Sequence, residues 1–181
     1  MKKIVIIGPE STGKSTLCKQ LAAHYNTIWV EEFAREYLLK NGTAYNYENL
    51  LAIAKGQVSS EQLAVDSWLL ANKSAIGNLK SPIFMDTDMY VMKVWCEFVF
   101  DKCHHWILNR IAERQYDLYL FCNIDLPWVK DELREYPDLI SRQKLYNHYK
   151  DILINQNVPW VDISGSYEER LGKAILAVQG V

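Results

Sequence analysis

A run of small and charged residues near the N-terminus has the composition of a phosphate-binding loop. The sequence GPESTGKS at positions 8–15 fits the pattern G-x-x-x-x-G-K-[S/T] at every fixed position. Its glycines allow successive backbone N–H groups to face one concavity, and a helix that begins near Lys14 adds the positive end of its dipole. Lys14 can reach the outer phosphates, and the Ser15 hydroxyl can complete the shell of a bound Mg²⁺. The sequence therefore predicts a site for ATP and Mg²⁺ formed by Gly8, Glu10, Ser11, Thr12, Gly13, Lys14, Ser15 and Thr16.

The surroundings of this motif narrow the class of protein. It lies between an apolar run and a helical pattern, and a chance match in such a chain has a frequency below about 1%. A switch-type GTPase would carry D-x-x-G and N-K-x-D, but here the third predicted strand runs into DTDM, and the NK pair at 72–73 is followed by SA. Motor and remodelling ATPases need more length than 181 residues. The sequence therefore predicts a small kinase that acts on a nucleotide, a nucleoside or another small metabolite.

Two acids follow the third predicted strand. Asp86 comes directly after the run at 82–85, where a carboxylate can hold Mg²⁺ directly or through a water. The alternative is that Asp86 only caps the next turn. Asp88, two residues later, either contacts the substrate or stays solvated. We expect Ser15 and Asp86 to be the metal ligands.

Two more acids, Glu31 and Glu32, follow the second predicted strand. A kinase needs a carboxylate that orients the attacking hydroxyl and accepts its proton, and Glu32 is our first choice. The alternative is a helix N-terminus with an i,i+3 ion pair between Glu32 and Arg35. Asp86 and Asp88 remain competing choices for the base.

A charged segment after the fourth predicted strand resembles a mobile lid. Residues 127–142 include Arg134 and Arg142, and mobile arginines can neutralise the charge that spreads over the equatorial oxygens in phosphoryl transfer. Trp128 lies beside them, where its ring can stack on a base. The alternative is a charged helical hairpin exposed to solvent. We expect a helical lid at about 127–142, with Lys14, Glu32, Asp86, Arg134 and Arg142 as the catalytic residues.

The pattern of apolar residues predicts the elements that position these groups. Short apolar runs typical of buried parallel strands occur at residues 3–7, 27–30, 82–85, 117–124 and 158–163. Helical periods occur after residue 14, from 47 to about Ile76 with a break near Gly56, around 106–114 and 145–153, and after Ser166, whose spacing to Glu169 predicts a capping box. Strands that alternate with helices predict an α/β fold of the P-loop NTPase, nucleoside/nucleotide-kinase type, with a parallel sheet of about five strands flanked by helices. Ligands bind such sheets at the carboxyl ends of the strands.

Composition sets limits on the partners. The net charge is −2 and the pI about 6.1, whereas a protein that tracks nucleic-acid phosphates usually has a basic surplus. No apolar run approaches the roughly 20 residues that span a bilayer. The four cysteines show no CxxC spacing, which is typical of reduced thiols. We therefore expect one cytoplasmic domain over residues 1–181 that binds small molecules, not nucleic acid or membrane.

Five segments together resemble the ribosylnicotinamide kinase domain of NadR-type NAD-salvage proteins. They keep the order and spacing of that family's motifs from the first strand to about Arg142. The segments are GPESTGKST at 8–16, EFAREY at 32–37, IAKGQ at 53–57, FMDTD at 84–88 and PWVKDELR at 127–134. The first motif is shared by many families, but the set of five in order is specific.

The resemblance implies transfer of the γ-phosphate of ATP to the 5′-hydroxyl of nicotinamide riboside, which gives nicotinamide mononucleotide. It also favours Glu32, Arg35, Gln57 and Asp88, with Trp128 beside the lid, as substrate-binding residues. A kinase for another nucleoside or small metabolite, or an ATP-binding regulatory module without turnover, remains the alternative. NadR-type proteins often carry an adenylyltransferase domain as well, and we expect no room for one in this length.

Two departures from the family pattern concern the acceptor and the lid. Val91 and Met92 stand where the family often has paired threonines, and Glu132 replaces the glycine of the lid motif. Both changes leave the phosphate-binding residues intact. They bear on which acceptor is bound and how the lid closes.

Overall fold

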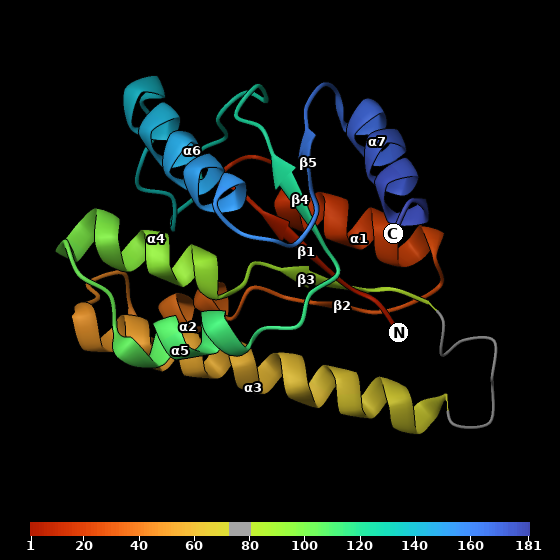
Figure 1. Cartoon of the computed structure of the whole chain (residues 1–181). Coiled ribbons are helices and arrows are strands. Elements are labelled where there is room, and N and C mark those ends of the chain that lie inside the picture. Colours follow the sequence, from red (N-terminus) through yellow and green to blue (C-terminus); the bar gives the residue numbers. More distant parts are fainter. Residues whose placement is uncertain (73–80) are drawn as a thin grey trace.

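A five-stranded sheet, with every strand parallel to its neighbours, forms the centre of the computed structural model (Figure 1), which describes residues 1–72 and 81–181. The strand order is β2-β3-β1-β4-β5. The strands are β1 (Lys3–Ile7), β2 (Trp29–Val30), β3 (Ile83–Asp86), β4 (Leu118–Cys122) and β5 (Trp160–Ile163). The predicted parallel sheet of five strands is therefore confirmed.

Helices cover both faces of this sheet. Side chains alternate along β1, so that Ile4 and Ile6 pack against one layer of helices and Val5 and Ile7 against the other. The first layer is α1 (Lys14–His24) and α7 (Tyr167–Gln179), which lie side by side in Figure 1. The second layer includes α3 (Tyr47–Ala71), α4 (Met89–Phe100) and α6 (Leu139–Ile154), with α2 (Phe33–Asn41) and α5 (His105–Glu113) packed beside it.

The strand order determines where ligands can bind. The chain leaves β1 for β2 and β3 on one side and then crosses to β4 on the other, so β1 lies between β3 and β4. A crevice forms at the carboxyl edge where the direction of such connections reverses. The phosphate loop follows β1 directly at this edge, Glu31 follows β2, and Asp86 ends β3.

One helix was not predicted, and one predicted break is absent. The helix α4 is additional to the predicted ones, and the capping box of Ser166 and Glu169 at the start of α7 is confirmed. The helix α2 begins directly after Glu32, as the alternative for the two acids expected, but Arg35 pairs with Asp131 and not with Glu32. The helix α3 runs over 25 residues without a break at Gly56. The predicted end of this helix near Ile76 lies outside the described residues. Gly56 serves close packing instead, because a Cβ there would lie 2.0 Å from Cε1 of Phe33.

Gly56→Ala is therefore expected to destabilise the fold. The added methyl group must displace the Phe33 ring, at a cost of about 1–3 kcal/mol that outweighs the better helix propensity of alanine. Unfolding in urea measures the change. The control is Gly172→Ala in α7, where a Cβ meets nothing within 4 Å and stability should stay equal or rise by up to about 1 kcal/mol. If the two variants are equally stable, the Phe33 ring can move away from the added methyl group without a cost in stability, and the prediction is wrong.

The segment predicted as a helical lid is irregular over residues 127–138. Pro127 and Pro137 supply no backbone N–H for a helix, and the helix α6 begins only at Leu139, after Asp138 has accepted a 2.8 Å hydrogen bond from the N–H of Ser141. The lid is thus a loop that leads into α6, and only residues 139–142 are helical.

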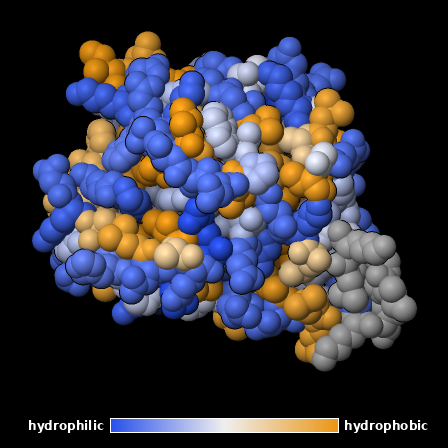
Figure 2. Space-filling model, viewed as in Figure 1, coloured by the Kyte–Doolittle hydropathy of each residue, from blue (hydrophilic) through white to orange (hydrophobic). Residues whose placement is uncertain are grey.

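The surface is mixed in polarity. On the face shown in Figure 2, hydrophilic residues separate the hydrophobic ones into small patches, one of which lies over the start of α6, where Leu139 and Ile140 are 66% and 72% exposed. In the part of the chain that the structure describes, no helix combines the length and apolar character needed to cross a membrane.

Candidate active site

The phosphate loop has the conformation that its sequence predicts. Gly13 precedes α1 with a φ of 80°, in the left-handed region that favours glycine. Gly8 lies so close to β4 that a Cβ would be 2.7 Å from the carbonyl oxygen of Cys122. The Thr12 hydroxyl and the Lys14 ammonium both donate to the carbonyl oxygen of Pro9, at 2.7 and 2.9 Å. These bonds hold the loop in a closed ring at the N-terminus of α1.

A cavity of about 1080 Å³ opens in front of this loop. Its volume is at the upper end of ligand pockets, roughly 300–1,000 Å³, and exceeds what one small nucleoside needs. The predicted site residues that line it are Gly8, Glu10, Ser11, Thr12, Gly13, Lys14, Ser15, Thr16, Glu32, Arg35, Asp86 and Arg134. Four predicted residues, Gln57, Asp88, Trp128 and Arg142, are not part of its lining. The structure therefore brings most of the predicted residues together in one place.

Asp86 has the surroundings of a cation ligand. The residue is 1% exposed, and its Oδ1 atom is buried without a hydrogen-bond partner. Burial and the nearby charge of Glu32 raise the pKa of Asp86, while Lys14 and a hydrogen bond from Ser15 oppose that rise. A divalent cation between Ser15 and Asp86 would satisfy the unpartnered oxygen, so these residues fit Mg²⁺. Within residues 1–72 and 81–181 no cluster of three or more His, Cys, Asp or Glu could hold a metal, and Mg²⁺ bound through one carboxylate and phosphates needs none.

Glu32 is positioned by a residue that lies behind it. Glu32 precedes the first turn of α2, and its neighbour Phe33 donates its N–H to Oε1 of Gln57 at 2.7 Å. Gln57 is 4% exposed, and its Nε2 donates to the carbonyl oxygen of Glu31 at 3.4 Å. Gln57 thus supports the backbone on both sides of Glu32 from outside the cavity.

Asp88 faces away from the cavity and is fully engaged by the protein. It is 2% exposed, and its two carboxylate oxygens accept from the N–H of Tyr90 at 2.9 Å and the hydroxyl of Tyr119 at 2.7 Å. Burial raises its pKa to about 6. Thr87 between the two aspartates has a φ of 76°, which is rare for a β-branched residue. This turn of the backbone lets Asp86 line the cavity while Asp88 caps α4.

The lid loop lies against the phosphate loop. The N–H of Val129 donates to Oγ of Ser11 at 2.9 Å, and Glu10 accepts from the N–H groups of Glu135 and Tyr136 at 3.0 and 2.6 Å. Side chains of the phosphate loop therefore bind the backbone of the lid directly.

Arginines on and near the lid differ in their access to the cavity. Arg134 lines the cavity and donates to the carbonyl oxygen of Val129. Arg35 also lines it and forms two hydrogen bonds with Asp131, at 3.3 and 3.0 Å, which lower the pKa of that carboxyl.

Arg142 is 5% exposed and binds backbone. Its Nη2 donates to the carbonyl oxygens of Ile124 and Leu126, both at 3.2 Å, and burial lowers its pKa. Trp128 is half-buried, with an indole Nε1 that is buried without a partner. Neither side chain contributes to the cavity wall in this structure.

The cavity has an aromatic wall that the sequence did not indicate. The wall consists of Tyr45, Trp95, Phe98 and Tyr136. The indole of Trp95 donates to the Tyr45 hydroxyl at 2.9 Å, and this hydroxyl donates to Glu135 at 2.8 Å. Trp95 and Phe98 belong to the apolar helix α4 and therefore resemble core residues in the sequence. The arrangement can hold a flat ring, with a carboxylate at its edge.

Comparisons with known proteins agree with this architecture. A family model described as an AAA domain matches residues 3–170. The trifunctional NAD biosynthesis/regulator protein NadR of Escherichia coli (strain K12) is 28% identical over 184 residues, which cover 99% of this chain and 42% of NadR. The chain thus spans less than half of the length of this curated relative. The resemblance to NadR-type proteins is therefore confirmed over almost the whole chain.

Two solved structures show the same fold. A NadR protein in complex with NR superposes with a TM-score of 0.79 and 23% identity, covering 99% of this chain and 49% of that one. A deoxyadenosine kinase from M. mycoides superposes with a TM-score of 0.62 and 12% identity, covering 99% and 100%. The predicted P-loop kinase fold is confirmed by these similarities.

Proposed function

We propose that this chain, which belongs to the AAA domain family by a match over residues 3–170, uses its phosphate loop to phosphorylate nicotinamide riboside. ATP and Mg²⁺ serve to phosphorylate the 5′-hydroxyl of this nucleoside, and the product is nicotinamide mononucleotide, an intermediate of NAD salvage. The observation that carries the proposal is that the phosphate loop, Asp86 and Glu32 line the same cavity. The similarity to NadR supports the choice of nicotinamide riboside.

Each group at the phosphate end has a role in this proposal. Lys14 and the loop N–H groups hold the β- and γ-phosphates, and Ser15 and Asp86 hold Mg²⁺. The bound ion would neutralise phosphate charge. Glu32 orients the acceptor hydroxyl and takes its proton as the hydroxyl oxygen bonds to the γ-phosphorus and the bond to the β–γ bridging oxygen breaks, releasing ADP.

The arginines divide into two groups in this proposal. Arg134, on the cavity wall, neutralises the transferring phosphoryl group, whereas Arg142 would reach it only after releasing the carbonyl oxygens of Ile124 and Leu126. We propose residues 127–142 as the lid of a single kinase domain over residues 1–181.

The aromatic wall supports nicotinamide riboside over neutral nucleosides. The nicotinamide ring of nicotinamide riboside is a pyridinium cation, and cations bind over the faces of Trp and Tyr side chains. Glu135 also lines the cavity, accepts a hydrogen bond from the Tyr45 hydroxyl of this wall, and supplies a compensating charge. We place the reaction in the reducing cytoplasm, where the four free cysteines of the chain would remain thiols.

A steady-state assay of the purified chain tests the proposal. ADP release is measured with ATP, Mg²⁺ and either nicotinamide riboside or neutral nucleosides (adenosine, cytidine, uridine, thymidine), and the product is identified by mass. We expect nicotinamide riboside to have the highest kcat/KM. Preference for a neutral nucleoside would identify a different nucleoside kinase. ATP binding without turnover on any acceptor would favour a regulatory module and overturn the proposal.

A further inference from the structure

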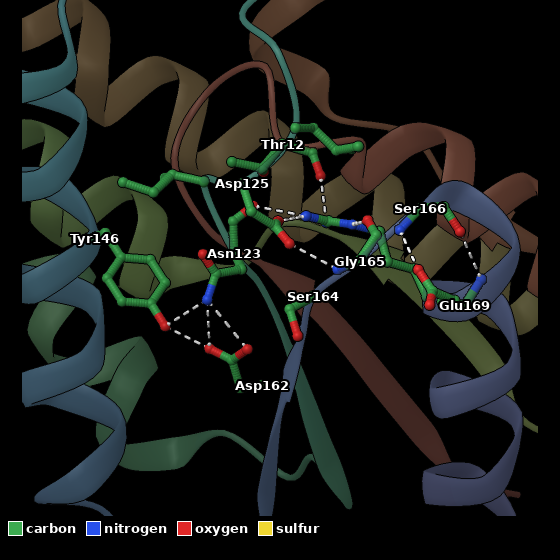
Figure 3. A network of polar contacts seen from close by, with 12 residues as sticks. Thr12, Asn123, Asp125, Tyr146, Asp162, Ser164, Gly165, Ser166 and Glu169 are labelled. Atoms are coloured by element: carbon green, nitrogen blue, oxygen red, sulfur yellow. Dashed lines mark hydrogen bonds and ion pairs between the residues drawn. The ribbon is translucent and has the colours of Figure 1, made fainter.

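Arg170 joins three segments that are distant in the sequence, and its partners Thr12, Asn123, Asp125 and Gly165 are labelled in Figure 3. It lies in the first turn of α7 and is 2% exposed. Its Nε donates to the carbonyl oxygen of Gly165 at 2.8 Å, and its Nη1 donates to that of Thr12 at 2.9 Å. Its Nη2 donates to the carbonyl oxygen of Asn123 at 3.0 Å and pairs with Asp125. One guanidinium therefore binds the phosphate loop, the end of β4 and the turn before α7.

The bond to Thr12 fixes the orientation of a phosphate-binding group. The peptide bond between Thr12 and Gly13 is trans and planar, so the N–H of Gly13 points opposite to the carbonyl of Thr12. Because Arg170 holds that carbonyl on the α7 side of the loop, the N–H of Gly13 is directed to the other side. Gly13 lines the cavity. We propose that Arg170 is a positioning residue, which aims the Gly13 N–H at the phosphates of the bound triphosphate.

The other contacts at this place do not need Arg170. The turn before α7 is already held by a 2.6 Å hydrogen bond from the N–H of Gly165 to Asp125. The helix itself begins with the capping box of Ser166 and Glu169. The turn before α7 therefore has attachments besides Arg170, and of the bonds that Arg170 makes, the one to Thr12 is the one that reaches the phosphate loop. A buried guanidinium is costly unless its donors are used, and here they bind three carbonyl oxygens and a carboxylate.

Binding of inorganic tripolyphosphate to the full-length chain, measured by calorimetry, tests the inference. Arg170→Met should raise the Kd by roughly 10- to 100-fold, the effect of losing one charge-assisted hydrogen bond. In the kinase assay, KM for ATP should rise while KM for the acceptor stays within about twofold of the wild-type value. The matched control is Lys173→Met, one turn further along α7, because Lys173 donates to the carbonyl oxygen of Ser164 at 2.9 Å but does not bind the phosphate loop. Its Kd should be that of the wild type.

The outcomes distinguish positioning from a structural role. A variant Arg170→Met that melts at a lower temperature but binds tripolyphosphate as tightly as the wild type would overturn the inference. If Arg170→Met does not fold, Arg170→Gln takes its place. Glutamine has a nitrogen at the position of the arginine Nε, which binds Gly165, but no counterpart of the Nη1 and Nη2 atoms, which bind Thr12 and Asn123. A severalfold weaker binding of tripolyphosphate then supports the inference, and an unchanged Kd overturns it.

The inference rests on the proposed function only in naming ATP as the ligand. If wild-type protein binds tripolyphosphate but phosphorylates no acceptor, the proposed function fails, and the comparison of variants still decides the role of Arg170.

Discussion

Replacement of Glu32 by glutamine is expected to lower kcat by about 10²- to 10⁴-fold, the range for loss of a general base. Glutamine keeps the shape of the side chain and can still orient the acceptor hydroxyl, but it cannot take the proton. The backbone around Glu32 should stay in place, because Gln57 binds the N–H of Phe33 and the carbonyl oxygen of Glu31. KM for ATP should therefore change little, since the phosphate loop is untouched. Steady-state rates with varied ATP and varied acceptor measure both quantities.

Two further variants separate Glu32 from its neighbours. Glu31→Gln removes the same charge one residue earlier and should keep most of the activity. Asp86→Asn should raise the Mg²⁺ concentration needed for half-maximal rate, a change that Glu32→Gln should not produce. If Glu32→Gln retains more than about a tenth of wild-type kcat, a loss below the usual range, another group is the base. If the wild-type chain binds ATP without turnover, and Glu32→Gln leaves that binding unchanged, the chain behaves as a regulatory module and not as a kinase.

The strands were predictable because buried parallel strands are apolar along their whole length. The run at 82–85 is seen as Ile83–Asp86, and all its residues are buried. The helix α4 escaped detection for the same reason. Val91 and Val94 pack toward the sheet, and Met89 and Met92 pack toward the neighbouring helices. Only Lys93 and Glu97 are charged in this helix, so its polar face is too narrow to give a clear helical period. The helix α2 has only nine residues, which is too few for a clear period.

The site was predictable where its chemistry depends on neighbours in the sequence. The phosphate loop is such a case, because its spacing alone brings Lys14 and Ser15 to the N-terminus of a helix. The sequence assigned Asp86 to the metal but left Asp88 between substrate and solvent, and it could not show that Asp88 is buried, since that depends on the positive φ of Thr87 and on contacts with Tyr119. Arg170 could not be found at all, because it binds Thr12 across 158 positions of the sequence.

The burial of Arg142 could not be predicted either, because it also depends on contacts between segments that are distant in the sequence. The sequence shows that an arginine follows the lid motif. It does not show whether the N–H groups of this arginine donate to a phosphate of the ligand or to backbone carbonyl oxygens of the protein. Here the carbonyl oxygens of Ile124 and Leu126 are close enough to bind it once α6 packs against the sheet. Local patterns therefore identify the phosphate end of the site, and tertiary packing selects the residues at the lid and the aromatic wall.

Replacement of Lys14 by methionine is expected to lower kcat/KM for ATP by about 10²- to 10³-fold, the effect of removing one group that stabilises developing charge. Methionine keeps most of the apolar stem but leaves the outer phosphates without their cation. Stability should fall by no more than about 1 kcal/mol, because the hydrogen bond from Lys14 to the carbonyl oxygen of Pro9 is a single bond that water can replace. Steady-state kinetics and thermal unfolding with and without ATP provide the measurements, since a ligand that binds only the folded state raises Tm.

Lys40→Met is the matched control, because it makes the same lysine-to-methionine change outside the cavity. Lys40 is exposed in the last turn of α2 and does not line the cavity. ATP should raise the Tm of Lys40→Met as much as that of the wild type, and it should raise the Tm of Lys14→Met much less. An equal stabilisation of both variants by ATP would mean that the triphosphate does not bind at this loop. The roles assigned to Ser15, Asp86 and Glu32 would fall with it, because all three are placed relative to the γ-phosphate.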